Sequence, residues 1–158
     1  MALLASLAVG VSRTSETPGL ATRYGLAGAY WLTSALGAGF EATGFSNISS
    51  FATDNIGCQS PRPCYSGDPR NRSGWLLEPR FLLGRRVSIV RFYAAFGLGL
   101  AREDVPSIPS RSYFAIGGSL EGAASVDLGR FSFVPTLRID AMDGAAAALL
   151  KLSVGVNL

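Results

Sequence analysis

The sequence predicts an all-β protein, an eight-stranded antiparallel up-and-down β-barrel that crosses a membrane, with residues 1–158 forming a single domain. Three observations support this prediction. Apolar and polar residues alternate with a period of two, which places them on opposite faces of strands. Short and long links between the segments alternate along the chain. The charged residues of these segments share one face.

The first segment, near Leu3–Val11, has the weakest alternation. Met1–Val11 also resembles the apolar part of a signal peptide. Because no Lys or Arg precedes it, we expect the first strand of a mature chain, with a signal remnant as the alternative. The seven stronger segments are Tyr24–Leu32, Leu36–Thr43, Trp75–Gly84, Val90–Leu100, Phe114–Leu128, Phe131–Ala141 and Leu149–Leu158.

Each of these seven segments has an apolar face and a small or polar face. The second and third alternate large apolar residues with glycine, alanine and Glu41. The fourth opposes aromatic and leucine residues to Glu78 and Arg80, and the fifth opposes them to Arg91 and glycine. The sixth segment has its apolar residues at even positions and the seventh at odd positions. In the eighth segment, leucine and valine share the face opposite Lys151. The total of eight is even, as an antiparallel barrel that closes on itself requires.

The links alternate in length along the chain. Tight turns are expected around Thr33-Ser34, Gly84-Arg85-Arg86 and Gly129-Arg130. The other links are Ser12–Gly19, Ser46–Ser73, Arg102–Ser112 and a short one around Asp143-Gly144. Short periplasmic turns at one end and longer extracellular loops at the other are typical of outer-membrane barrels.

The composition excludes several classes of protein. Charged residues make up only 16% of the chain, against about 25% in soluble domains, while 48% of residues are hydrophobic. No apolar run reaches the roughly 18 residues of a membrane-spanning helix. The net charge is +3, but the basic residues are scattered, so no nucleic-acid partner is expected. No metal cluster or phosphate-binding glycine motif is present, and we expect no cofactor.

Alternation alone does not say which face points inward. The polar face consists mostly of Gly, Ala and Ser, which suit a narrow lumen better than a water-exposed surface. Its five acidic and five basic residues are expected to form a paired network in the lumen, because unpaired buried charges cost several kcal/mol each. These residues are Arg23, Glu41, Glu78, Arg80, Arg91, Glu121, Asp127, Arg138, Asp140 and Lys151. Two alternatives are a conducting pore lined by charge and a soluble ligand-binding barrel of the lipocalin class.

Aromatic residues on the apolar face are expected to form two belts at the membrane interfaces. The outer belt comprises Tyr24, Trp75 and Phe114, and the inner belt Tyr30, Phe92, Phe131 and Phe133. Packing inside a soluble sheet is the alternative. Pro79 and Pro135 also fall on this face, where we expect local bulges to accommodate them.

Three stretches resemble the small eight-stranded outer-membrane barrels of the OmpA and OmpX kind: Gly25–Tyr30, Ala35–Glu41 and Leu152–Leu158. The final strand of such proteins usually ends in an aromatic residue, whereas this one ends in Leu158. The resemblance implies the outer membrane of a Gram-negative bacterium, contact with membrane lipid or lipopolysaccharide, and a role in anchoring, adhesion or envelope integrity. A monomer is expected.

The longest link, Ser46–Ser73, is the expected site for an extracellular ligand, because loops on a rigid barrel commonly carry binding residues. The alternative is a solvated loop with no partner. Cys58 and Cys64 within it would form a disulfide in an oxidising compartment.

The chain contains no histidine, which removes the usual general base of the enzymes found among small barrels. Glu78, Glu121 and Asp127 are the remaining candidates, and their spacing does not distinguish them from members of a salt-bridge network. The sequence therefore predicts no catalytic residues. The expected function is a structural, anchoring or loop-mediated binding role, with a narrow pore or conduit for small or lipophilic solutes as the alternative.

Overall fold

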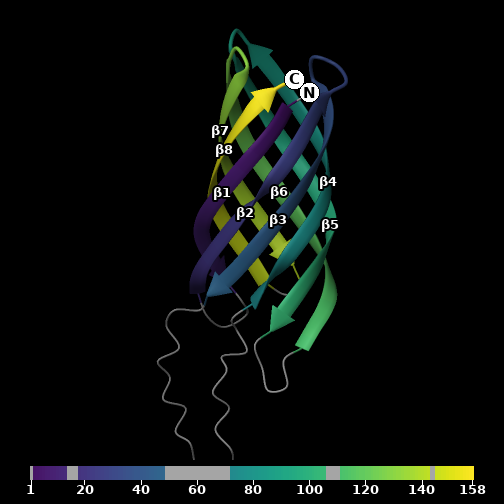
Figure 1. The fold of residues 1–158 in the computed structure, drawn as a ribbon, viewed down its shortest axis with the longest axis vertical. Coiled ribbons are helices and arrows are strands. Elements are labelled where there is room, and N and C mark those ends of the chain that lie inside the picture. The colour runs from purple at the N-terminus through teal and green to yellow at the C-terminus, as the bar shows by residue number, and fades with distance from the viewer. Residues whose placement is uncertain (1, 14–17, 49–71, 106–110, 143–144) are drawn as a thin grey trace, which may run out of the picture.

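The computed structural model describes residues 2–13, 18–48, 72–105, 111–142 and 145–158. In these residues eight strands form one closed barrel, each paired antiparallel with its neighbour in sequence, and the first paired with the last (Figure 1). The strands are β1 (Ala2–Arg13), β2 (Pro18–Trp31), β3 (Leu36–Ile48), β4 (Arg72–Val87), β5 (Val90–Val105), β6 (Arg111–Leu128), β7 (Phe131–Met142) and β8 (Ala145–Asn157). The predicted fold class is therefore confirmed. Among the described residues, no helix has the length and hydropathy needed to cross a membrane.

The barrel carries its apolar side chains on the outside. Along β7, exposed and buried residues alternate without interruption from one end of the strand to the other. Leu98, Leu120 and Leu152 are 57%, 55% and 46% exposed, whereas Glu41 and Glu78 are fully buried. A lipocalin-like barrel requires the opposite orientation, so these exposures contradict that alternative.

Both chain termini and the short turns lie at one end of the barrel (Figure 1), which we call the turn end; the opposite end is the loop end. Two of the three turns lie where the sequence predicts them. Thr33 accepts hydrogen bonds from the backbone N–H groups of Ala35 and Leu36, at 3.2 and 2.9 Å. Gly129 adopts a φ of 66°, a conformation that glycine reaches without strain.

The turn predicted at Gly84-Arg85-Arg86 is wrong. β4 continues through these residues to Val87, and the turn lies at Ser88-Ile89, with Ser88 at a φ of 57°. Gly84 resembles a turn residue, but its role is steric. A Cβ at Gly84 would lie 2.5 Å from the carbonyl oxygen of Phe92 on β5, so only glycine fits this close approach.

Several strands are longer than predicted. β3 reaches Ile48. β5 continues to Val105 and β6 begins at Arg111, so much of the predicted link Arg102–Ser112 is strand. The predicted fifth segment ends at Leu100, just before the charged residues begin. The alternation nevertheless continues there, because Arg102 is exposed and Glu103 is buried. The N-terminal segment forms β1, as expected.

The two outward-facing prolines, Pro79 and Pro135, lie in the strands without the expected bulges. Between β4 and β5 the paired residues are Leu77 with Leu100 and Arg80 with Gly97, which is the same register on both sides of Pro79. The β6–β7 register is likewise unchanged across Pro135. Two residue pairs are missing from the ladder at each proline, so the missing N–H interrupts the hydrogen bonding without inserting a residue.

Candidate functional site

A network of charged side chains fills the middle of the lumen. Inward-facing positions recur at every second residue of a strand, and each member of the network occupies one of these positions. The members come from seven strands: Arg23 on β2, Glu41 on β3, Glu78 and Arg80 on β4, Glu103 on β5, Glu121 on β6, Arg138 and Asp140 on β7, and Lys151 on β8.

Arg138 is the hub of this network and is only 1% exposed. Its Nη1 donates to Oε2 of Glu41 at 3.0 Å and to Oε1 of Glu121 at 2.9 Å. Its Nη2 donates to Oε2 of Glu78 at 3.0 Å, and its Nε donates to Asp140. The planar guanidinium, with five donors in fixed directions, suits a position surrounded by carboxylates.

Glu41 and Glu121 bridge the remaining cations. Lys151 Nζ lies 3.2 Å from both carboxylate oxygens of Glu41 and 2.6 Å from Oε1 of Glu121. Arg80 forms ion pairs with the same two glutamates. These contacts join β3, β4, β6, β7 and β8 across the lumen, so the network connects strands that are not neighbours in the sheet.

Towards the loop end, the network meets an apolar layer. Arg23 Nε donates to Oδ2 of Asp140 at 3.0 Å, and the guanidinium carbon lies 4.7 Å from the centroid of the Phe45 ring. Phe45 packs inside the barrel with Leu76, Ala101 and Met142. The lumen therefore contains an ionic layer and, beside it, a plug of apolar side chains.

The structure brings together eight of the ten predicted lumen charges and separates the other two. Arg91 and Asp127 lie at the turn end and form no ion pair with the central network in the part of the chain that is described. Glu103 is a buried charge that was not among the predicted lumen residues. It shares the inward parity of Arg91 and lies three residues beyond Leu100, where the predicted strand ends, so two further residue pairs of alternation include it.

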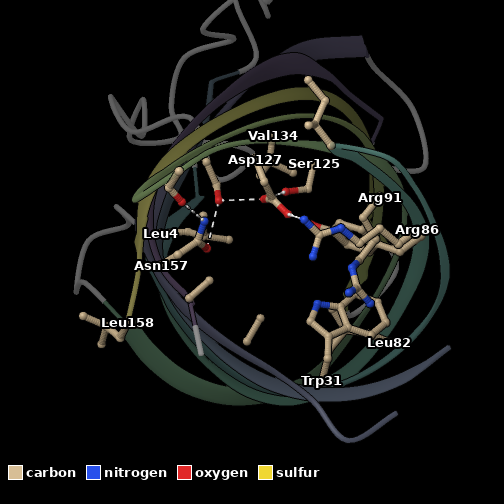
Figure 2. Close-up of a pocket in the computed structure, with 16 residues that line it drawn as sticks. Leu4, Trp31, Leu82, Arg86, Arg91, Ser125, Asp127, Val134, Asn157 and Leu158 are labelled. Atoms are coloured by element: carbon tan, nitrogen blue, oxygen red, sulfur yellow. Dashed lines mark hydrogen bonds and ion pairs between the residues drawn. The ribbon is translucent and has the colours of Figure 1, made fainter. Parts of the chain in front are cut away.

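The turn end of the lumen is a vestibule of about 510 Å³. Leu82, Val134 and Tyr93 are among the side chains that line it. Figure 2 shows Arg86, Arg91 and Trp31 on one side of the opening and Asp127 across from the tryptophan.

Specific contacts fix the groups of the vestibule. The guanidinium carbon of Arg91 lies 4.0 Å from the centroid of the Trp31 ring, which meets Tyr93 edge-on at a centroid distance of 5.9 Å. Asp127 accepts hydrogen bonds from the hydroxyl groups of Ser125 at 3.1 Å and Ser132 at 2.9 Å.

All seven residues of the predicted aromatic belts are exposed on the outer surface. Near the loop end these are Tyr24, Trp75 and Phe114, and near the turn end Tyr30, Phe92, Phe131 and Phe133. The rings of Trp75 and Phe114 meet edge-on, with centroids 6.3 Å apart. The ring of Tyr24 covers Gly44, where a Cβ would lie 2.5 Å from the tyrosine Cζ.

The predicted disulfide falls outside the described residues, because Cys58 and Cys64 belong to residues 49–71. Among the residues that are described, no group of three or more Cys, Asp or Glu side chains is arranged to hold a metal ion.

No protein-family model matches the sequence, and no protein of curated function matches it. Solved structures do match the fold. The Neisserial surface protein A, NspA, has a TM-score of 0.68 at 14% identity, over 99% of this chain and 96% of that one. Ail, the attachment invasion locus protein of Yersinia pestis, has a TM-score of 0.59 at 11% identity, over 98% and 95%. The outer membrane enzyme PagL has a TM-score of 0.62 at 14% identity, over 95% and 97%.

The chain has the fold of the small eight-stranded outer-membrane barrels. This confirms the resemblance to the OmpA and OmpX kind at the level of the fold. A closed antiparallel barrel with an apolar outer surface is the architecture of Gram-negative outer-membrane proteins, and this chain shares that architecture. In such barrels the short turns face the periplasm, so the turn end of this chain corresponds to their periplasmic end.

Proposed function

We propose that this barrel is non-enzymatic, that its lumen is closed by the central network, and that it serves the outer membrane through a structural, anchoring or loop-mediated binding role. The observation that supports a closed lumen is the set of ion pairs through Arg138, Glu41, Glu121 and Lys151. An eight-stranded barrel has an interior just wide enough for its side chains. A solute could pass only if these buried pairs separated, and breaking one buried pair costs about 3–5 kcal/mol.

The placement of the carboxylates supports a non-enzymatic role. PagL shares the fold and is an enzyme, so the fold by itself does not decide the question. In this chain, Glu78 and Glu121 are buried and bound by Arg138, where no substrate reaches them. Asp127 is held by Ser125 and Ser132. No histidine is available to act as a general base anywhere in the sequence.

Loop-mediated binding is supported by the form of the scaffold. Residues 49–71 connect β3 to β4 at the loop end, on the side that faces the exterior in barrels of this kind. NspA is a surface protein and Ail an attachment and invasion protein, and Ail has been solved with the heparin analogue sucrose octasulfate. For this chain we propose an extracellular ligand at residues 46–73, lipid or lipopolysaccharide around the barrel, and a monomeric state.

Planar-bilayer recording tests the closed lumen. The purified protein, inserted at a density at which a known porin gives clear steps, is expected to give no steady current. Stable open-channel steps would contradict the closed lumen and support the narrow conduit. Gel migration before and after boiling serves as the control for folding, because a folded barrel migrates differently from the boiled chain.

Bacterial adherence tests the loop. Cells that display the full chain are expected to bind a heparin-coated surface, whereas cells that display a variant with residues 49–71 replaced by a short turn are not. Both proteins should show the same heat-dependent migration. Equal adherence of the two strains would refute a binding role for the loop, and adherence by neither would leave the structural role as the function.

A further inference from the structure

We propose that the periplasmic vestibule binds a phosphate group between Arg86 and Arg91. This site is separate from the central network and from the extracellular loop, and its argument rests on the charges, geometry and shape of the turn end.

The two arginines form an unfavourable pair in the absence of an anion. Arg86 and Arg91 are directly paired residues of the β4–β5 ladder, and both line the vestibule. Like charges at directly opposite positions of a ladder destabilise a sheet. The only carboxylate that reaches either of them within the described residues is Asp127, whose Oδ2 lies 3.7 Å from Nη2 of Arg86.

Most hydrogen-bond donors of this pair have no protein acceptor. Each guanidinium carries five N–H donors. Within the described chain, Arg86 donates from Nε to the carbonyl oxygen of Ser88 at 3.0 Å, and Arg91 donates from Nη1 to the carbonyl oxygen of Ser34 at 3.2 Å. A phosphate group has several terminal oxygens and can accept from both guanidinium groups at once, which a single carboxylate does less well.

Each arginine has a contact within the protein that orients its guanidinium group. Arg91 stacks on Trp31, and a stacked guanidinium keeps its edge donors available. The acceptor for Arg86 is the carbonyl oxygen of Ser88, which has a φ of 57° in a turn without glycine. Non-glycine residues in this conformation cost about 1–3 kcal/mol and cluster at functional sites. A preorganised site binds more tightly because less freedom is lost on binding.

The cavity leaves room for more than the phosphate itself. Its volume of about 510 Å³ lies in the range of small-molecule sites. Leu82, Val134 and Tyr93 provide apolar surface for the rest of a ligand. Arg130 lies at the same end and adds to its positive potential. The phosphate could belong to a soluble periplasmic phosphate ester or to the headgroup of a phospholipid of the inner leaflet.

Isothermal titration calorimetry with inorganic pyrophosphate, in a maltoside detergent, tests the site. The wild-type protein is expected to bind saturably with one site. Arg86→Gln and Arg91→Gln are each expected to weaken binding at least tenfold. Arg85→Gln is the matched control, since it removes the same charge one residue away on the outer face, and its affinity should stay within twofold of the wild type.

A fluorescence measurement locates the bound anion. In a Trp75→Phe background Trp31 is the only tryptophan, and pyrophosphate is expected to change its emission with the same midpoint as in calorimetry. Addition of a short-chain phosphatidylglycerol distinguishes the two sources: competition indicates a lipid headgroup, and its absence a soluble phosphate ester. The proposal is overturned if no saturable binding occurs, if Arg85→Gln weakens binding as much as Arg86→Gln, or if Trp31 emission does not respond.

Discussion

Replacement of Arg138 by methionine is the sharpest perturbation of the lumen. Methionine has a similar length but no charge, so the change removes the hub of the network while filling much of its volume. Glu41 and Glu121 would keep Arg80 and Lys151, and Asp140 would keep Arg23. Glu78 would lose its ion pair, because Arg138 is its only ion-pair partner among the described residues.

The expected loss of stability follows from the unpaired carboxylate of Glu78. Leaving a single buried charge without its partner costs about 3–5 kcal/mol. We therefore expect the free energy of unfolding of Arg138→Met to fall by about this amount. Adding Glu78→Gln removes the orphaned charge, and since a buried neutral polar group costs about 1–3 kcal/mol, the double variant should recover part of the loss.

Urea unfolding in lipid vesicles, followed by tryptophan fluorescence, measures these differences. Arg102→Met is the matched control: Arg102 is 47% exposed and lies 3.7 Å from the half-exposed Asp104, and such surface pairs contribute about 0–1 kcal/mol. If Arg138→Met were as stable as Arg102→Met, the ion pairs of Arg138 would not stabilise the barrel. If Glu78→Gln recovered nothing, the loss would have another origin.

Two further predictions concern packing and the membrane. Gly99→Ala places a Cβ 2.0 Å from the backbone oxygen of Leu77 and should destabilise the barrel by about 1–3 kcal/mol in the same urea assay. Gly122→Ala, which meets nothing within 4 Å, should be nearly neutral, and equal effects would refute the steric argument. Leu98→Arg, midway along β5 on the outer face, should cost about 2–4 kcal/mol, and Leu128→Arg at the end of β6 about 0–1 kcal/mol. Equal costs for the two arginines would contradict a bilayer around the barrel.

The strand period made most of the fold predictable. It fixes which side chains share a face, so the inward positions of Glu41, Arg138 and Lys151 follow from parity once a strand is recognised. The eight alternating segments are compatible with a closed antiparallel barrel, and the pairing of β1 with β8 shows the closure. The ion-pair partners do not follow from parity, because Arg138 meets Glu41 and Glu78 across the lumen from strands that are not its neighbours.

The wrong predictions lie where the local residue composition and the strand period of two indicate different structures. Gly84 and the two arginines after it have turn composition, yet the glycine is required by a close backbone approach inside β4. Ser88 lies in the observed turn, in a conformation that serine seldom adopts, so the residues of this turn did not predict its position. The vestibule was not predicted either, because the pairing of Arg86 with Arg91 depends on that turn and its register.

Nitroxide scanning along β7 tests the central feature of this account, the outward placement of the apolar face. Single cysteines at residues 131–142, spin-labelled in bilayers with both native cysteines replaced, report collision rates with oxygen, which concentrates in lipid. The structure predicts high rates at odd positions from Phe131 to Ala141 and low rates at even positions, including Arg138 and Asp140. High oxygen accessibility at the even positions, or no alternation at all, would contradict it.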